Sequence, residues 1–483
     1  MKVDPVALRR PFLIWLIPAV WTVAFGLWGL SRQDSVWRDE AATWQVAQRS
    51  TEEIARMLEH VDVVHSLYYL FMHGLFECFG PSTTVLRLPS VLAIAVGAAC
   101  VSLIGHRLAG TCVGLGGGLV FGMLPAVQFY LQEGRPYALV AAGVGISTLL
   151  LVSVLQGCDR KRSWVAYGCA VLICGYLNWL ALLILPAHLG TLVWARAARQ
   201  VRERWAAASA AAVLGVLPLI LFSMGQSGQV SWVPPLTWHM LIGPAVLLTI
   251  GGLGSLVDQR AGRLSVAAVG LPLLAAPQIG LIGLSLFKPL FVDRYILFSL
   301  LGLALLIGSV IGWVVREVAH GSWNASRWVL PIMIAVAVIS LLPQSLAKRS
   351  PASRVDDVLA AAEQTRRLKQ DGDGVLFIPA ARRDTMLVSP DAFTDMQDLA
   401  LAETPEESGT LKGVEASPSQ IRAAMLTHRR ILLVTDATEV ARPTKGERDR
   451  TKIEVLKAYF TLVSEEQVRG RRVALYESLE PPL

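Results

Sequence analysis

Long uncharged stretches repeat along the first 350 residues of the chain. A helix needs about 20 predominantly apolar residues to cross a bilayer, and eleven stretches reach or approach that length. They are residues 11–30, 85–105, 111–131, 136–157, 164–177, 180–195, 205–224, 239–257, 264–287, 294–315 and 327–346. The fifth and sixth are short and meet in a predicted hairpin at 176–179. The pattern predicts an α-helical polytopic membrane domain with about eleven crossings, and ten or twelve are also compatible with it.

Residues 350–483 follow a different pattern. Short apolar runs typical of buried strands lie at 375–378, 431–434 and 472–476, and helical periodicity lies at 352–370, 418–428 and 447–462. Strands that alternate with helices predict a small α/β domain with a parallel sheet. Residues 388–417, rich in Asp, Glu, Ser, Thr and Pro, are predicted to form a loop.

Charge separates the same two regions. Of the 81 charged residues, 41 lie in the last 133 positions and only 40 in the first 350. Ionisable groups are costly in hydrocarbon, so the two regions face different solvents. We therefore predict a membrane domain at 1–349 and a soluble α/β domain at 350–483. Because the net charge of +7 comes from cations between the apolar stretches, it predicts membrane orientation and no nucleic-acid partner.

The cations favour alternate loops. One set holds Arg107, the cluster at 160–162, four arginines within 196–204, and further arginines at 260, 263, 316 and 327. By the positive-inside rule this set is cytoplasmic. The N-terminus is then cytoplasmic, and the C-terminal domain and the long loop 31–84 are extracytoplasmic. Within that loop, Ser50-Thr51-Glu52-Glu53 predicts a capped helix at 51–60, and 65–79 an interfacial helix.

Several ionisable residues lie on the predicted outer side, and among them the cations run against this bias. The first group is Arg38-Asp39-Glu40, which follows the first helix, and the second is Asp62, His65 and Tyr69 before and within the next helix. A carboxylate in a low-dielectric cleft can deprotonate an acceptor hydroxyl. An ordinary solvated acidic pair, or a structural histidine, fits the same residues.

Cations also mark the outer ends of other predicted helices. They are Arg87, Arg135 within Glu133-Gly134-Arg135-Pro136-Tyr137, and Lys288 and Arg294 on either side of Asp293. An arginine at a helix N-terminus suits phosphate, although anchors at the membrane interface would look the same. No motif is specific alone. Together, cations gathered on the side where they are disfavoured predict a bound anion.

These motifs resemble the GT-C superfamily of glycosyltransferases. Asp39-Glu40 after the first helix is similar to the acidic motif of that superfamily. Three further motifs resemble the protein mannosyltransferase and aminoarabinose transferase group. They are Asp62 before Leu67-Tyr68-Tyr69, the segment Leu86-Arg87-Leu88-Pro89-Ser90, and the Glu133–Tyr137 motif. The resemblance covers 11–195 well and Asp293-Arg294-Tyr295 less closely. It does not cover the soluble domain.

The resemblance implies a sugar transfer from a polyprenyl-phosphate donor to an extracytoplasmic hydroxyl, with inversion at the anomeric carbon. Mannose is the expected sugar. The sequence does not identify the molecule that carries the acceptor hydroxyl. Asp39 is expected to be the base, with Glu40 beside it; if a divalent cation such as Mg²⁺ or Mn²⁺ takes part, these two are its expected ligands. Relatives have Pro-Pro where this chain has His65-Ser66, and aminoarabinose transferases have a phosphate-binding lysine where it has Val64. Phosphate contact is therefore expected from His65, Arg135, Lys288 or Arg294.

Two other classes fit parts of the pattern. A transporter or polyprenyl-phosphate flippase would place polar residues near the middle of its helices, whereas here they gather at helix ends. A sensor would bind a ligand in the soluble domain and would not need the acidic loop. Only the glycosyltransferase hypothesis gives a role both to the acidic residues and to the cations at the predicted outer helix ends.

Overall fold

The computed structural model describes residues 12–226, 232–257, 262–443 and 446–479. The chain divides into two compact units, neither of them continuous in sequence. The helical unit contains the residues up to Leu30, Val64–Tyr68 and Arg87–Leu346. The mixed unit contains Ser31–Val63, Tyr69–Leu86 and the residues from Ala347 onward. Much of the predicted outer loop thus groups with the C-terminal residues, although the predicted boundary at 349/350 separates them in sequence.

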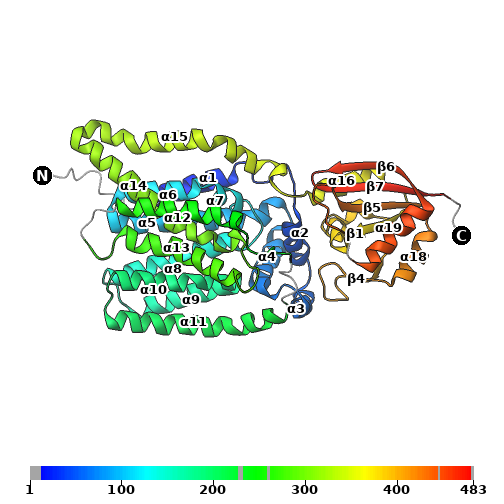
Figure 1. The fold of residues 1–483 in the computed structure, drawn as a ribbon, viewed down its shortest axis with the longest axis horizontal. Helices are drawn as coiled ribbons and strands as arrows, with labels where there is room; N and C mark the ends of the chain where they lie inside the picture. The colour runs from blue at the N-terminus through cyan, green and yellow to red at the C-terminus, as the bar shows by residue number, and fades with distance from the viewer. Residues whose placement is uncertain (1–11, 227–231, 258–261, 444–445, 480–483) are drawn as a thin grey trace. The chain divides into compact units, whose positions relative to one another are not determined.

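Each of the eleven predicted apolar stretches coincides with helix in the described part of the chain (Figure 1). Seven helices are long and apolar enough to cross a membrane, and three further apolar helices are shorter. The helices are α1 (Phe12–Leu27), α5 (Thr83–Ala109), α6 (Thr111–Met123), α7 (Pro125–Tyr130), α8 (Tyr137–Leu155), α9 (Lys161–Leu177), α10 (Ile184–Trp194), α11 (Arg199–Gly225), α12 (Ile242–Leu256), α13 (Val266–Ser285), α14 (Leu300–Gly321) and α15 (Trp323–Arg349). Short 3₁₀ turns η2 (Trp179–Leu183), η4 (Trp238–Leu241) and η5 (Asp293–Ser299) precede α10, α12 and α14.

Two local features were tested by the structure. The predicted hairpin is confirmed: α9 ends at Leu177, and the side chain of Asn178 accepts a hydrogen bond from the Leu180 amide at 3.1 Å. The prediction of one continuous helix at 111–131 is wrong, because α6 ends before Leu124, whose ψ is 131°. The helical region is disfavoured for a residue that precedes proline, and Pro125 then begins α7.

Glycines allow close approach of neighbouring helices in the helical unit. A Cβ atom on Gly308 of α14 would lie 2.6 Å from the carbonyl oxygen of Val113 and 2.8 Å from the amide nitrogen of Gly117. Small residues allow backbones of membrane helices to approach in this way. The contact explains how α6, only 13 residues long, is held against α14.

The mixed unit begins with helices from the predicted outer loop. These are α2 (Arg38–Ala47), α3 (Thr51–His60), the turn η1 (Val63–His65) and α4 (Ser66–Phe79), but the short stretch Val64–Tyr68 within η1 and α4 belongs to the helical unit. The predicted capping box is confirmed, with the Ser50 amide donating to the Glu53 carboxylate at 2.8 Å. Val46, Ile54, Met57 and Tyr69 form a buried cluster within this unit.

The C-terminal residues add an α/β sheet with strand order β2-β1-β5-β7-β6. Its strands are β1 (Gly374–Ile378), β2 (Gln397–Asp398), β5 (Arg430–Asp436), β6 (Phe460–Val468) and β7 (Arg471–Ser478). The helices are α16 (Val358–Leu368), α17 (Asp384–Val388), α18 (Pro418–Leu426) and α19 (Glu447–Tyr459), with 3₁₀ turns η6 (Pro351–Ser353), η7 (Ala380–Arg383) and η8 (Pro390–Phe393). Short strands β3 (Leu401–Glu403) and β4 (Val414–Glu415) form a separate ribbon within the segment predicted as a loop.

The prediction of a parallel sheet is correct only for β2, β1 and β5, because β7 pairs antiparallel with both β5 and β6. The helix predicted at 447–462 ends at Tyr459, and the chain then enters β6. Positive φ angles at Arg469 (45°) and Gly470 (81°) form the tight turn into β7. Because β6 is largely exposed, it lacks the apolar alternation that predicts a strand.

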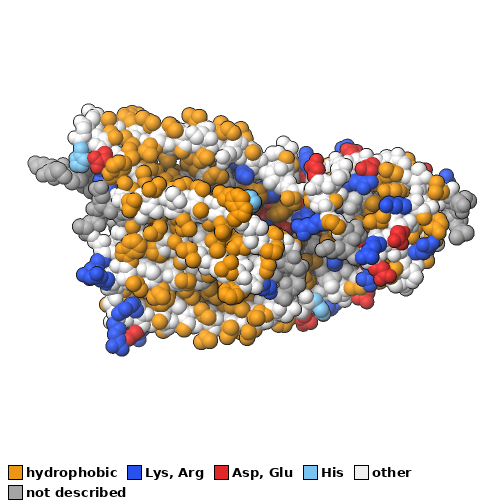
Figure 2. Space-filling view, in the orientation of Figure 1, with side chains coloured by type: hydrophobic (Ala, Val, Ile, Leu, Met, Phe, Trp, Pro, Cys, Tyr) orange, Lys and Arg blue, Asp and Glu red, His pale blue; other side chains and the backbone are white. Residues whose placement is uncertain are grey.

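The surfaces of the two units differ in composition. Figure 2 shows hydrophobic side chains over the visible face of the helical unit, whereas Lys, Arg, Asp and Glu are mixed over the sheet and its helices. Exposed apolar side chains such as Leu217, Leu253 and Ile339 belong to the candidate spans. This contrast agrees with a lipid-facing helical unit and a mixed unit in water.

Candidate functional site

The segment before α8 is fixed by hydrogen bonds inside the helical unit. The Ser90 hydroxyl donates to the carbonyl oxygen of Glu133 at 2.6 Å. The side-chain amide of Gln132 donates to the carbonyl oxygens of Gly26 and Trp28, both at 2.8 Å. Glu133 is buried. The loop that carries Arg135 is therefore held by the Ser90 side chain of α5 and by carbonyl oxygens at and just after the end of α1.

Arg135 lies just before the first turn of α8 and is only 7% exposed. Its guanidinium Nη2 donates to Nε2 of His65 at 3.1 Å. No side chain caps the start of α8 at Pro136, so the positive end of the helix dipole lies in the same place. The structure thus brings His65 and Arg135, 70 residues apart in sequence, to one helix N-terminus where phosphate is favoured.

Arg294 reaches the same end of α8 from the turn η5. Its guanidinium carbon lies 5.6 Å from the ring centre of Tyr137, 5.5 Å from that of Trp232 and 5.9 Å from that of Tyr295. Faces of aromatic rings attract the planar guanidinium and fix its orientation. Arg294 is half-buried among these rings, so the structure presents a second oriented cation at the start of α8.

The neighbouring predicted residues are placed differently. The Asp293 carboxylate accepts a hydrogen bond from the Tyr130 hydroxyl at 3.3 Å. Lys288 is exposed. Arg87 is fully buried in α5, and its Nη1 donates to the carbonyl oxygen of Leu30 at 2.8 Å. Arg87 therefore supports the end of the first helix and presents no surface to a ligand.

In the mixed unit, the acidic pair occupies the first turn of α2. Asp39 is half-buried, whereas Glu40 is completely buried. The Glu40 Oε2 atom accepts a hydrogen bond from Nη2 of Arg32 at 2.7 Å, and both side chains have no exposed surface. Carboxylates at a helix N-terminus are stabilised by the dipole. Only Asp39 of the two has surface available to a substrate.

Arg38, which precedes Asp39, is held by carboxylates from the C-terminal residues of the same unit. Its Nε donates to Asp356 at 2.8 Å and its Nη2 to Asp436 at 3.2 Å, while its amide donates to Asp356 at 3.0 Å. The buried Arg471 also donates to Asp356, at 3.0 Å. Arg38, predicted to bind substrate, thus anchors α2 to the α/β sheet.

Burial raises the pKa of Asp356, but the charges of Arg471 and Arg38 and the hydrogen bond from the Arg38 amide outweigh it and hold the pKa below its usual value. Asp356 is therefore ionised under ordinary conditions. A buried charge that is paired on two sides resists displacement, because removing one partner leaves the others uncompensated. The contact fixes the start of α2 and thereby the position of Asp39.

Asp62 and Tyr69 form a contact of their own within the mixed unit. The Tyr69 hydroxyl donates to the Asp62 carboxylate at 2.7 Å. Asp62 has a φ of 60°, in the left-handed region that Asp tolerates better than most residues. The Asp62 carboxylate thus contacts Tyr69, whereas His65 contacts Arg135.

A divalent cation would need further ligands beside Asp39. Within the described ranges, no group of three or more His, Cys, Asp or Glu residues is placed to hold a metal ion. The Glu40 carboxylate is enclosed and contacted by Arg32. The residues at this place therefore do not fit the predicted Asp39–Glu40 metal site.

Sequence reasoning missed the residues that act across long separations. Arg32, Asp356, Asp436 and Arg471 support α2, and Trp232 contacts Arg294. Asp356 is 318 residues from Arg38, so no local spacing connects them. The one available signal was the presence of charged residues in otherwise apolar strand ends, such as Asp436 and Arg471.

Comparisons with known proteins define the fold. Neither family models nor curated proteins match this sequence. Among solved structures, ArnT from Cupriavidus metallidurans in the apo state is 12% identical with a TM-score of 0.62, covering 95% of this chain and 97% of that chain. ArnT bound to undecaprenyl phosphate is 13% identical with a TM-score of 0.61, covering 97% and 98%. The apo oligosaccharyltransferase of Archaeoglobus fulgidus is 11% identical with a TM-score of 0.51, covering 90% and 70%.

These likenesses confirm the predicted architecture, a polytopic helical part with a C-terminal α/β part. The match extends along nearly the whole chain, including the soluble part that the sequence resemblance did not cover. At such low identity the likeness concerns the fold, and function has to be argued from the site.

Proposed function

We propose that this chain is an integral membrane glycosyltransferase that takes a sugar from a polyprenyl-phosphate donor and transfers it to an extracytoplasmic hydroxyl. The observation that carries the proposal is the pair of oriented cations, Arg135 beside His65 and Arg294 among aromatic rings, at the start of α8. The fold supports it, because one ArnT structure of the same fold was solved with undecaprenyl phosphate. Mannose is the proposed sugar, on the resemblance to protein mannosyltransferases.

The cations suit the leaving group of such a transfer. Breaking the bond between the anomeric carbon and the phosphate oxygen leaves a second negative charge on the polyprenyl phosphate. Oriented guanidinium groups stabilise a charge that develops in the transition state without having to reorganise. Arg135 can offer two parallel donors to phosphate oxygens, and Arg294 is held in place by Tyr137 and Trp232.

Asp39 is the proposed base. Its carboxylate would accept the proton of the acceptor hydroxyl as the oxygen forms its bond to the anomeric carbon, and one in-line displacement inverts the configuration there. Glu40 is left out of the chemistry because Arg32 engages its buried carboxylate. Arg38 acts on Asp39 indirectly, through its contacts with Asp356 and Asp436.

A donor panel tests the proposed reaction. Purified full-length protein would be incubated with mannose, glucose and aminoarabinose on polyprenyl phosphate, and with GDP-mannose, and released polyprenyl phosphate measured. We expect turnover with the lipid-linked mannose only. Turnover with the nucleotide sugar alone would refute the donor class, and turnover with another lipid-linked sugar would refute mannose. Movement of intact donor across vesicles without transfer would favour the flippase.

The orientation is proposed from the cation distribution, with the N-terminus cytoplasmic and the mixed unit outside. Native Cys158 and a substituted Asp371→Cys, both at exposed positions, would be compared in variants that lack the other cysteines. In intact cells an impermeant maleimide should label position 371 and should reach Cys158 only after lysis. The reverse pattern would invert the topology.

A further inference from the structure

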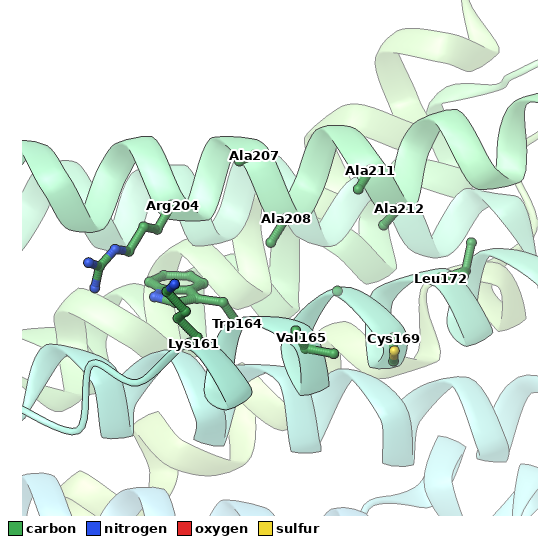
Figure 3. Close-up of a pocket in the computed structure, with 11 residues that line it drawn as sticks. Lys161, Trp164, Val165, Cys169, Leu172, Arg204, Ala207, Ala208, Ala211 and Ala212 are labelled. Atoms are coloured by element: carbon green, nitrogen blue, oxygen red, sulfur yellow. The ribbon is translucent and has the colours of Figure 1, made fainter.

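A groove runs between α9 and α11 in the helical unit, with a volume of about 530 Å³ (Figure 3). Its walls include small side chains, Gly168 and Cys169 on α9 and Ala208, Ala211 and Ala212 on α11, together with the apolar Trp164, Val165 and Leu172. Its volume lies within the range of small-molecule sites. The small side chains that α9 and α11 place along this groove leave an apolar channel that lipid or another apolar chain must fill in a membrane.

The groove is as long as one leaflet is thick. It is lined along α9 from Lys161 to Leu172, which corresponds to roughly 16 Å at 1.5 Å per residue. The hydrocarbon core of a bilayer is about 30 Å thick. A chain lying in the groove would therefore come from a lipid of one leaflet, with its headgroup at the end marked by Lys161.

That end of the groove is cationic. Lys161 and Arg204 line it (Figure 3), and Arg160 and Arg162 are exposed beside it. Asp159, the acidic residue nearby in sequence, already accepts hydrogen bonds from Arg204 at 2.6 Å and from the Trp164 indole at 2.7 Å. Within the described residues, the Lys161 ammonium has neither a hydrogen bond nor an ion pair. Lys161 also begins α9, whose N-terminus no side chain caps.

We infer that this groove binds an anionic phospholipid, with one acyl chain between α9 and α11 and the phosphate at Lys161 and the start of α9. Basic pockets between membrane helices recognise anionic headgroups in this way, and the helix N-terminus adds its own attraction for phosphate. The surplus of cations over Asp159 favours an anionic headgroup over a zwitterionic one.

The proposed lipid site is separate from the cations proposed for the donor. Arg135 precedes the first residue of α8, whereas Lys161 follows its last residue by six positions. α8 has 19 residues and is therefore about 28 Å long. The two phosphate positions thus lie at opposite ends of α8, and the lipid inference stands without the proposed transfer reaction.

Native mass spectrometry of the full-length protein would test the inference, using phosphatidylglycerol and phosphatidylcholine with the same acyl chains as probes. We expect wild-type protein to retain phosphatidylglycerol about tenfold more strongly, the effect of one charge-assisted hydrogen bond. Lys161→Ala should abolish that preference, and Ala211→Trp, which fills the groove, should reduce retention of both lipids. Arg263→Ala and Ala210→Trp are matched controls on exposed positions outside the lining and should change neither.

A second measurement needs no substitution. Cys169 is exposed and lines the groove, whereas Cys78 is exposed elsewhere, so phosphatidylglycerol should slow alkylation of Cys169 by a maleimide and leave Cys78 unchanged. Equal retention of both lipids by wild-type protein would overturn the inference, as would unchanged alkylation of Cys169. The inference would also be overturned if a polyprenyl phosphate displaced phosphatidylglycerol and this displacement required Lys161.

Discussion

The buried pair of Arg32 and Glu40 allows a sharp test of what Glu40 does. Both side chains are fully enclosed in the mixed unit, and their charged atoms lie 2.7 Å apart. Removing one member deprives the other of a buried charge partner, whereas removing both removes the two buried charges together. We therefore compare Glu40→Leu, Arg32→Met and the double variant. Unbranched methionine suits position 32, where φ is 49°.

The expected effect follows from burial. Breaking a buried ion pair by removing one partner costs about 3–5 kcal/mol, while replacing both partners by apolar residues is often neutral. Each single variant should therefore lower the free energy of local unfolding around α2 by about 3–5 kcal/mol. The double variant should recover most of that loss. At about 1.4 kcal/mol per tenfold change, amide exchange should accelerate roughly 10²- to 10⁴-fold in the single variants.

Hydrogen exchange of the full-length protein would be followed in peptides from α2, with peptides from α18 in the same unit as the control. Sugar transfer would be measured alongside. If Glu40 is structural, the double variant should regain both slow exchange and turnover. If Glu40 takes part in the chemistry, exchange should recover while turnover stays low. A double variant whose α2 exchanges as fast as that of either single variant would refute the reasoning from pairing.

Three further predictions concern Asp39, Arg135 and Asp356. Asp39→Asn should slow a single turnover about 10²- to 10⁴-fold with unchanged donor affinity, and a near-normal rate would remove Asp39 as the base. Arg135→Ala should weaken binding of polyprenyl phosphate about tenfold or more, whereas Arg107→Ala, an exposed control at the end of α5, should leave it unchanged; equal losses would indicate non-specific charge. Because the pKa of Asp356 is lowered in the folded protein, its carboxylate stabilises the mixed unit above about pH 4, and this is lost as pH falls through the folded pKa. Asp356→Asn should therefore melt lower than wild type at pH 7 and converge with it in acid; equal melting at pH 7 would contradict this.

The sequence predicted helices best where the apolar stretches are long. Each apolar stretch became helix because hydrocarbon requires every backbone group to bond within its own segment. The errors occurred where one residue outweighs a long pattern. The apolar run at 111–131 reads as one helix, but Leu124, for which the helical region is disfavoured before Pro125, leaves that region and ends α6. Strand β6 was missed because it lies at the edge of the sheet and is largely exposed, so it shows no apolar alternation.

The candidate site shows the same limit more strongly. Residue types identified Arg135, Arg294 and Asp39 as unusual, because cations and carboxylates at helix ends on one side need an explanation. They could not show that Arg87 and Glu40 are enclosed, since burial depends on partners distant in the chain. Leu30 for Arg87 and Arg32 for Glu40 became visible only when the fold was known.

The same long-range contacts bear on the C-terminal part. In α/β sheets, ligands bind beyond the carboxyl ends of parallel strands. Here that edge lies beyond β1 and β5, where Asp436 ends β5 and Arg382 follows β1, and the two pair at 2.6 Å. Arg38 contacts the same Asp436 at 3.2 Å. Arg38 thus lies at the edge of the sheet where a sensor domain would bind its ligand. This arrangement favours a sheet that supports the acidic loop over a separate ligand-binding domain.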